Sequence, residues 1–240
     1  MKRMMLFALA GLAIMSVCTM ANAEMLARYD TYNVKNDLEY PFDFATSGNN
    51  GTLAECIEYA TMDIADGASY PSYPASSQWS AKGFADGGSF VFTVEAAEGC
   101  CFNPDFLYAG GIKSSSTGPT SCTVTVDWID CGDTQVQTAT IDTYTPPTSS
   151  YKNDVYNLDL LIPGIGCDEQ GCVEWLQVKW YATGASSSSG TFRVGNYYEG
   201  GTYPPFGLDG ECCARIPEPT SLALLLAGAL GLVGLRRRSN

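Results

Sequence analysis

The feature that most constrains this chain is a repeated alternation of apolar and polar residues with a period of two. Residues 90–94 place Phe90, Phe92 and Val94 on one side of the chain. Residues 122–128 repeat the pattern with Cys122, Val124, Val126 and Trp128. Successive side chains of an extended strand point to opposite faces of a sheet. Both segments are therefore predicted as strands with one buried face.

Other segments extend this strand pattern along the chain. Residues 173–181 are apolar on both faces, which predicts a strand near the centre of a sheet. Further strands are expected at residues 191–194, 56–64, 106–112, 135–142 and 156–161. Turn-forming residues separate the strands at 85–88, 114–119, 145–150 and 184–190. About eight strands without a helical period predict an all-β fold, a single antiparallel β-sandwich of jelly-roll type, with an immunoglobulin-like sandwich as the alternative.

The N-terminus carries the pattern of a secretory signal peptide over residues 1–23. Lys2 and Arg3 precede an apolar run, and Ala21-Asn22-Ala23 supplies the small residues that signal peptidase requires. Cleavage after Ala23 would begin the mature chain at Glu24. A lipoprotein signal using Cys18 is the alternative, but Val17 stands where that signal needs a small residue.

The C-terminus, residues 217–240, is organised in three parts. Pro217-Glu218-Pro219 is followed by an apolar segment, residues 221–235, and then by Arg236, Arg237 and Arg238. As a helix the apolar segment would cover about 22 Å of a hydrocarbon core of roughly 30 Å, which makes it a poor permanent anchor. The prolines keep the backbone around Glu218 extended, and the arginines would hold the tail on the cytoplasmic side. A plain short tail anchor is the alternative.

These three parts resemble the PEP-CTERM sorting signal of exported bacterial proteins. The resemblance implies recognition and cleavage by an exosortase during export, with signal peptidase as the other processing partner. The order of blocks such as ATMDIADG, FVFTVEA and SSSTGPTSCTV, within residues 56–197, is similar to a layout seen in many proteins with this signal. The resemblance implies a cell-surface or extracellular-matrix protein of a polysaccharide-producing bacterium, transiently anchored in the inner membrane, and assigns no activity.

The predicted body, residues 24–216, is long enough for one domain, is strongly acidic and contains no histidine. The whole chain has a net charge of −13, and removing both ends takes away five basic residues and one acidic residue, which leaves −17. Such a surface repels phosphate backbones, so nucleic acid is not an expected partner. Without histidine, Ser-His-Asp sites, Cys-His sites and most zinc sites are excluded.

Cysteine is unusually frequent in this body. Disulfides are expected in the oxidising space that follows export. Local bridges are plausible for Cys167 with Cys172 and for Cys122 with Cys131, although the sequence alone leaves the pairing open. Adjacent residues of a strand point to opposite faces, so each cysteine doublet is expected to bond two different partners. The nine candidates are Cys56, Cys100, Cys101, Cys122, Cys131, Cys167, Cys172, Cys212 and Cys213.

Because the number of cysteines is odd, one of them is expected to stay a thiol or to bond to another chain. A thiolate zinc site is the alternative use of these residues. The chain lacks the repeated Cys-x2-Cys pattern typical of such sites, so no metal site is predicted.

Aromatic residues close to one loop are candidates for glycan contact. Tyr70 and Tyr73 lie in the segment Ser-Tyr-Pro-Ser-Tyr-Pro, and Trp79 follows closely. Flat rings held by prolines could stack on sugar rings. The alternative is that these rings cap one end of the sandwich, where Tyr and Trp bury an apolar body and keep a polar tip in water.

Acidic residues in two short loops are candidates for calcium binding. These residues are Asp130, Asp133, Asp168 and Glu169. Their spacing matches no calcium loop such as the EF-hand, so solvated turn residues are the preferred interpretation and no cofactor is predicted. A glycosidase would need two carboxylates, which no single strand face supplies, although a pair could come from different strands.

The function that these observations favour is a non-enzymatic, exported surface or matrix protein with a structural or adhesive role. A carbohydrate-binding module acting on exopolysaccharide is the first alternative. A carboxylate glycosidase is the second.

Overall fold

The structure, a computed structural model, describes residues 24–29, 42–44, 51–69, 78–165, 172–195 and 206–214. The predicted signal peptide, the sorting tail and its processing residues lie outside the described residues, as do Tyr70, Tyr73, Cys167, Asp168 and Glu169. Thirteen strands lie within the described ranges, and every pairing between them is antiparallel. The predicted all-β, antiparallel class is confirmed.

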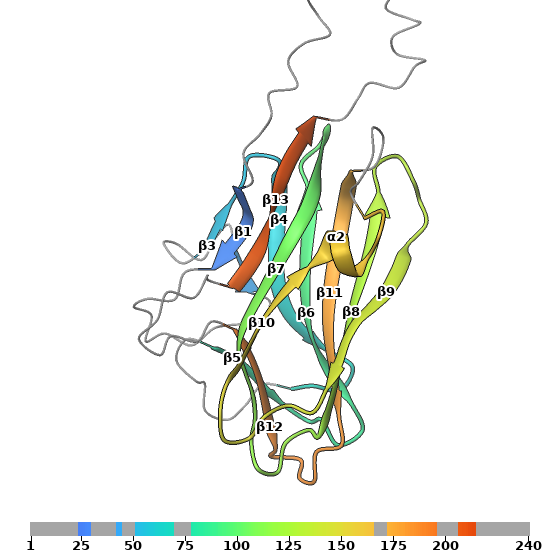
Figure 1. Cartoon of the computed structure of the whole chain (residues 1–240). Coiled ribbons are helices and arrows are strands. Elements are labelled where there is room, and N and C mark those ends of the chain that lie inside the picture. Colours follow the sequence, from blue (N-terminus) through green and yellow to red (C-terminus); the bar gives the residue numbers. More distant parts are fainter. Residues whose placement is uncertain are drawn as a thin grey trace, which may run out of the picture.

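The strands form two layers that pack face to face (Figure 1). The first layer contains, in order across the sheet, β2 (Phe42–Asp43), β4 (Ile57–Ala65), β6 (Gly88–Ala96), β11 (Val173–Thr183), β8 (Ser121–Asp130) and β9 (Gln137–Tyr144). The second contains β10 (Lys152–Asn157), β7 (Cys100–Ser114), β13 (Phe206–Ala214), β1 (Glu24–Tyr29) and β3 (Gly51–Leu53). The pair of Val173 and Phe102 connects β11 to β7 and so joins the layers.

Two further strands extend the second layer where β7 ends. There β12 (Thr191–Gly195) lies between β5 (Gln78–Lys82) and the last part of β7. One short helix, α2 (Leu158–Leu161), directly follows β10 and packs near β7. The strand prediction for residues 156–161 is thus wrong beyond Asn157, because the Asn157 side chain accepts a hydrogen bond from the Leu160 amide and caps this helix instead.

The core lies between the two layers and is formed by the residues that the alternation placed inward. Phe90, Phe92 and Val94 are fully buried on β6, and Val124 and Val126 are fully buried on β8. The prediction for residues 173–181 is also confirmed, since β11 lies between β6 and β8. Burial of this apolar surface is the main stabilising contribution to a fold of this kind.

Two disulfides tie the layers together. Cys56, the residue before β4, bonds to Cys212 on β13, and Cys101 on β7 bonds to Cys172, the residue before β11. Strand pairing gathers six strand ends at one end of the sandwich. Strands β4, β7 and β11 begin there, and strands β6, β8 and β13 end there. We call this end the cysteine end. It contains Cys56, Cys100, Cys101, Cys131, Cys172, Cys212 and Cys213.

Candidate functional site

Two aromatic rings lie on the outer face of the second layer. Phe106 and Tyr108 are two residues apart on β7, so their side chains share one face, while Leu107 between them is buried in the core. Their ring centroids are 6.3 Å apart and the rings are inclined by 29°, which is a stacked arrangement. Both residues are partly exposed. We call Phe106 and Tyr108 the aromatic platform.

Strand register determines which side chains surround the aromatic platform. Facing residues in an antiparallel sheet point to the same side. Phe106 faces Asn157 on β10 and Asp209 on β13, and Tyr108 faces Val155 and Gly207 on the same two strands. Arg28 on β1 faces Gly207 from the next strand. The platform is therefore flanked by a carboxylate, an amide and, one strand further, a guanidinium.

Acidic residues outnumber Arg28 around the platform. Burial of the Asp105 carboxyl, and then the charges of Asp159, Glu211 and Asp209, raise the pKa of Asp105 above its ordinary value. The pKa of Tyr108 is raised by burial and by the charge and hydrogen bonding of Asp209. This environment disfavours the ionised form of the Tyr108 hydroxyl.

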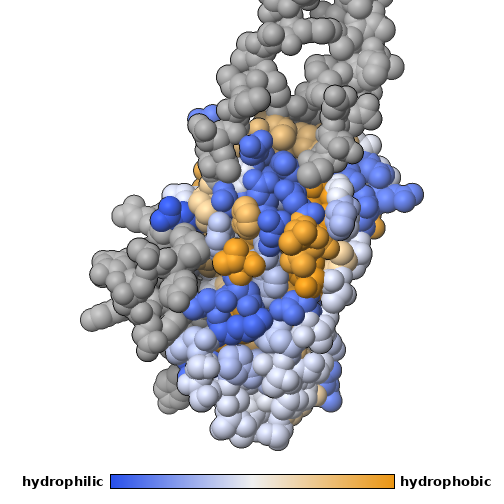
Figure 2. All heavy atoms as spheres, viewed as in Figure 1, coloured by the Kyte–Doolittle hydropathy of each residue, from blue (hydrophilic) through white to orange (hydrophobic). Residues whose placement is uncertain are grey.

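The same face carries exposed aliphatic side chains. Val155 on β10 is 56% exposed, and Leu160 on α2 is 77% exposed. Figure 2 shows hydrophobic patches beside strongly hydrophilic side chains over β7, β10 and α2. Apolar surface and hydrogen-bonding groups thus alternate over short distances on this face.

Trp79, which the sequence grouped with the loop tyrosines, lies in the core. Its side chain is fully buried, with its ring 4.8 Å from that of Tyr29 and 5.0 Å from that of Phe206 between centroids. A ring enclosed in this way offers no face to a sugar. The glycan-contact prediction is therefore wrong for Trp79. The alternative, a cap that keeps its polar tip in water, does not describe it either, because the whole side chain is buried.

Asp130 and Asp133 have partners within the protein. The Asp130 carboxylate accepts a hydrogen bond from the Gln137 side chain, which closes the turn between β8 and β9. Asp133 accepts hydrogen bonds from the amides of Thr134 at 2.7 Å and Gln135 at 3.2 Å. These contacts are those of turn-stabilising acids, the preferred interpretation of the sequence.

A pair of carboxylates from different strands does meet at one edge of the sandwich. Asp142 on β9 and Asp154 on β10 both contact Lys152 Nζ, at 3.1 and 2.6 Å. The Tyr156 hydroxyl lies 3.2 Å from Asp142 and 2.9 Å from Asp154. Both carboxylates are engaged by a cation and a hydroxyl, so this cluster has the chemistry of a structural link between strands.

The local disulfide predictions are wrong. Cys172 bonds to Cys101 rather than to Cys167, because its strand enters the sheet beside β7. Cys122 and Cys131 stand at opposite ends of β8, about 30 Å apart along an extended strand, whereas a disulfide needs Cα atoms within about 7 Å. The expectation for the doublets is met only in part, since each doublet bonds one distant partner, through Cys101 or Cys212, rather than two.

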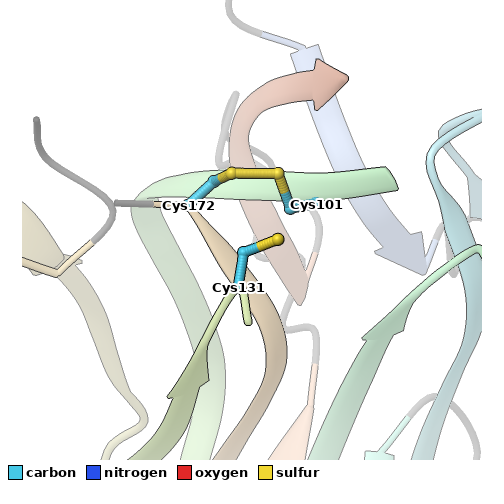
Figure 3. A group of neighbouring side chains, drawn as sticks. All are labelled: Cys101, Cys131 and Cys172. Carbon is cyan, nitrogen blue, oxygen red and sulfur yellow. A yellow bond between two sulfur atoms is a disulfide. The ribbon is translucent and has the colours of Figure 1, made fainter. Parts of the chain in front are cut away.

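Three sulfur atoms gather at the cysteine end. The Sγ atoms of Cys101, Cys131 and Cys172 lie within 4.8 Å of one another, on β7, after β8 and before β11 (Figure 3). A metal would need all three as thiolates, whereas two of them are joined as a disulfide in this structure. In this oxidised state the group therefore cannot supply three thiolate ligands.

Sequence reasoning missed the aromatic platform. Residues 106–112 were predicted as a strand, and the order Phe106-Leu107-Tyr108 shows that one face carries two aromatic rings. The sequence does not show which of the two faces meets the core. That choice depends on the pairing of β7 with β10 and β13, which are distant along the chain.

Comparison with known proteins gives structural neighbours only. No family model matches the chain, and no curated protein matches it. A domain of tailspike protein 4 from bacteriophage CBA120 is similar over 62% of this chain, with 13% identity and a TM-score of 0.28, and the chain covers 18% of that structure. The CBM22-1-GH10 modules of xylanase 10B from Clostridium thermocellum are similar over 64% of this chain, at 10% identity and a TM-score of 0.33, with 25% of that structure covered.

A third neighbour is a single module. The family 11 carbohydrate-binding module from Clostridium thermocellum, solved with a mixed-linked tetrasaccharide, is similar over 78% of this chain and 96% of its own. The identity is 10% and the TM-score is 0.32. At such identities and TM-scores the likeness carries no functional conclusion.

Among the described residues, no helix has the length and apolar character needed to cross a membrane. The predicted apolar segment, residues 221–235, is outside that part of the chain.

Proposed function

We propose that this protein is a carbohydrate-binding module that holds a neutral polysaccharide on its aromatic platform. The observation that carries the proposal is the stacked, partly exposed pair of Phe106 and Tyr108 with Asp209 and Asn157 beside it. A sugar ring presents C–H groups on its faces and hydroxyl groups at its edge. Aromatic rings pack against the faces, and carboxylate and amide groups bond to the hydroxyls.

The charge of the site restricts the kind of sugar. Asp105, Asp209 and Glu211 place negative charge on this face, and the pKa of Asp105 is already raised by burial and by its acidic neighbours. A polysaccharide rich in uronic acids or sulfate would add further negative charge there and be repelled. The expected ligand is therefore a neutral hexose or pentose chain.

The proposal is tested by affinity electrophoresis and calorimetry with a soluble neutral β-glucan and with polygalacturonate as the acidic comparison. Wild-type protein is expected to bind the neutral glycan. Phe106→Ala and Tyr108→Ala are each expected to weaken that binding at least about tenfold, because each removes one stacking surface. The matched control is Tyr181→Ala, which removes a tyrosine exposed on β11 in the other layer.

Several results would contradict the proposal. One is equal binding by wild type and both platform variants, with each variant shown to be folded by circular dichroism. Failure of the wild type to bind across a panel of neutral glycans is another. Preference for polygalacturonate, or release of reducing sugar from the bound glycan, would also exclude a neutral, non-catalytic site.

We also propose that the protein acts outside the cell, where binding would give it an adhesive role in a polysaccharide layer. Support comes from the sequence signals at residues 1–23 and 217–240 and from two disulfides, which persist in oxidising compartments. The intact mass of the exported protein tests this. A chain that begins near Glu24 and lacks the apolar tail is expected, and a full-length tail in exported material from a strain with an active exosortase would contradict it.

A further inference from the structure

Cys172 lies between β7 and β8, and a cysteine of each neighbouring segment lies close to it. Val173, the first residue of β11, pairs with Phe102 on β7 and with Asp130 on β8. The register with β8 therefore places Cys172 opposite Cys131, which follows Asp130. Cys101, which precedes Phe102 on β7, is reached by the disulfide. The Cys172 carbonyl accepts a hydrogen bond of 2.6 Å from the Cys131 amide. Figure 3 shows the Cys131 sulfur beside the Cys101 end of the disulfide.

The backbone is suited to either of two disulfides. The Cα atoms of Cys101 and Cys172 are 5.6 Å apart. The register that pairs Val173 with Asp130 places Cys172 opposite Cys131, and such facing residues have Cα atoms about 4.5–5.5 Å apart. Disulfides form at Cα separations of about 4.4–6.8 Å. A bond from Cys172 to Cys131 therefore needs no strand to move to a new register.

We propose that Cys101, Cys131 and Cys172 form a thiol–disulfide exchange site. Cys131, a thiol in this structure, loses its proton and attacks Cys172 Sγ. The bond between Cys131 and Cys172 forms as the bond between Cys101 and Cys172 breaks, and Cys101 leaves as a thiolate that takes up a proton. One disulfide and one thiol are present before and after, so the step needs no oxidant or reductant.

The exchange changes which parts of the fold are linked. The bond from Cys101 to Cys172 joins β7 in the second layer to β11 in the first, whereas a bond from Cys131 to Cys172 joins β8 and β11 within the first layer. After exchange, the bond from Cys56 to Cys212 remains as a covalent link between layers. The released Cys101 is buried beside the Cys213 carbonyl, 3.7 Å from its sulfur.

The proposal is tested on the native, oxidised protein held at about pH 8, where an ordinary thiol is partly ionised. Samples are quenched in acid, treated with N-ethylmaleimide and digested with a protease that cleaves after acidic residues, which separates Cys172 from Cys167 at Asp168 and Glu169. Mass spectrometry then quantifies the linked peptides. Both the Cys101–Cys172 and the Cys131–Cys172 peptides are expected, at a ratio that becomes constant with time.

Three variants sharpen this test. Cys131→Ser is expected to contain the Cys101–Cys172 bond alone, and Cys101→Ser is expected to form the Cys131–Cys172 bond completely. Cys122→Ser is the matched control, since it removes a thiol at the other end of β8 and should leave the wild-type ratio unchanged. Circular dichroism checks that each variant is folded, and the wild-type measurement needs no variant at all.

The proposal is overturned if wild-type protein keeps the Cys101–Cys172 bond alone after long incubation. It is equally overturned if folded Cys101→Ser protein has both Cys131 and Cys172 alkylated. A disulfide from Cys131 to Cys167, or one zinc ion per chain released when these three cysteines are alkylated, would assign the cluster to a different chemistry. None of these results depends on glycan binding, so the two proposals fail separately.

Discussion

Lys152 Nζ lies 3.7 Å from the centre of the Tyr144 ring, so one cation on β10 is held against the neighbouring edge strand β9. The same ammonium contacts the Asp142 and Asp154 carboxylates. Because β9 belongs to the first layer and β10 to the second, this group links the layers along one edge. The disulfides link them at one end.

Replacing Lys152 should weaken that edge. Lys152→Met keeps the length of the side chain but leaves Asp142 and Asp154 without the cation between them. We expect the free energy of unfolding to fall by about 1–2 kcal/mol, between the effects of exposed and buried ion pairs. Urea denaturation measures this, with Lys113→Met, which removes a cation–π contact to Tyr151, as the control. An unchanged midpoint for Lys152→Met would contradict the role of this cluster.

The burial of Trp79 predicts a large effect on stability and none specific to glycan binding. Trp79→Ala should lower the free energy of unfolding by about 3–5 kcal/mol, because it leaves a cavity beside Tyr29 and Phe206. Trp79→Phe refills part of that space and should recover much of the loss. If folded Trp79→Phe protein lost glycan binding while keeping wild-type stability, Trp79 would have to contact the sugar after all.

At neutral pH the protein should be less stable with Asp105 than with an uncharged side chain at this position. Burial and neighbouring acids raise its pKa in the folded state above the ordinary 3.8, so folding disfavours its ionised form. This destabilisation of the folded state is present at pH values above the raised pKa and disappears as the pH falls below 3.8. Asp105→Asn is therefore expected to raise the melting temperature at pH 7 and to have no effect at pH 3. A melting temperature at pH 7 that is unchanged or lower in Asp105→Asn would contradict this.

Removing the disulfide between Cys56 and Cys212 should destabilise the sandwich substantially. These residues are 156 positions apart, and closing so long a loop restricts the unfolded chain strongly. The double variant Cys56→Ser with Cys212→Ser is expected to lose about 2–5 kcal/mol of unfolding free energy. Its melting temperature is compared with that of Cys122→Ser, which breaks no disulfide. A shift no larger than the control would show that the bond contributes little.

The sequence predicted the fold where the pattern was local. Strands β6, β8 and β11 alternate strictly or are apolar on both faces, and their burial follows the alternation. Strand β13 was missed because glycines and a cysteine doublet interrupt its pattern, so that Phe206 and Leu208 alone mark its inner face. The helix α2 was missed because its signal is a single capping residue, Asn157.

The candidate site depended on information that no local pattern contains. That Phe106 and Tyr108 face outward follows from the pairing of β7 with β13, which lies about a hundred residues further along the chain. The partners of Cys101 and Cys172 likewise depend on where β11 enters the sheet. For Trp79 the local pattern was misleading, since this aromatic residue follows a loop of tyrosines but is buried in the interior.

The position of Cys212 has a mechanical consequence. Cys212 lies two residues before Ala214, the end of β13. Tension applied through the chain beyond Ala214 reaches this disulfide before it reaches most of the hydrogen bonds between β13 and β7. The covalent bond passes the load to Cys56 and so to β4 in the opposite layer. A protein held by its C-terminal end would resist being peeled apart one strand at a time, because both layers would bear the force together.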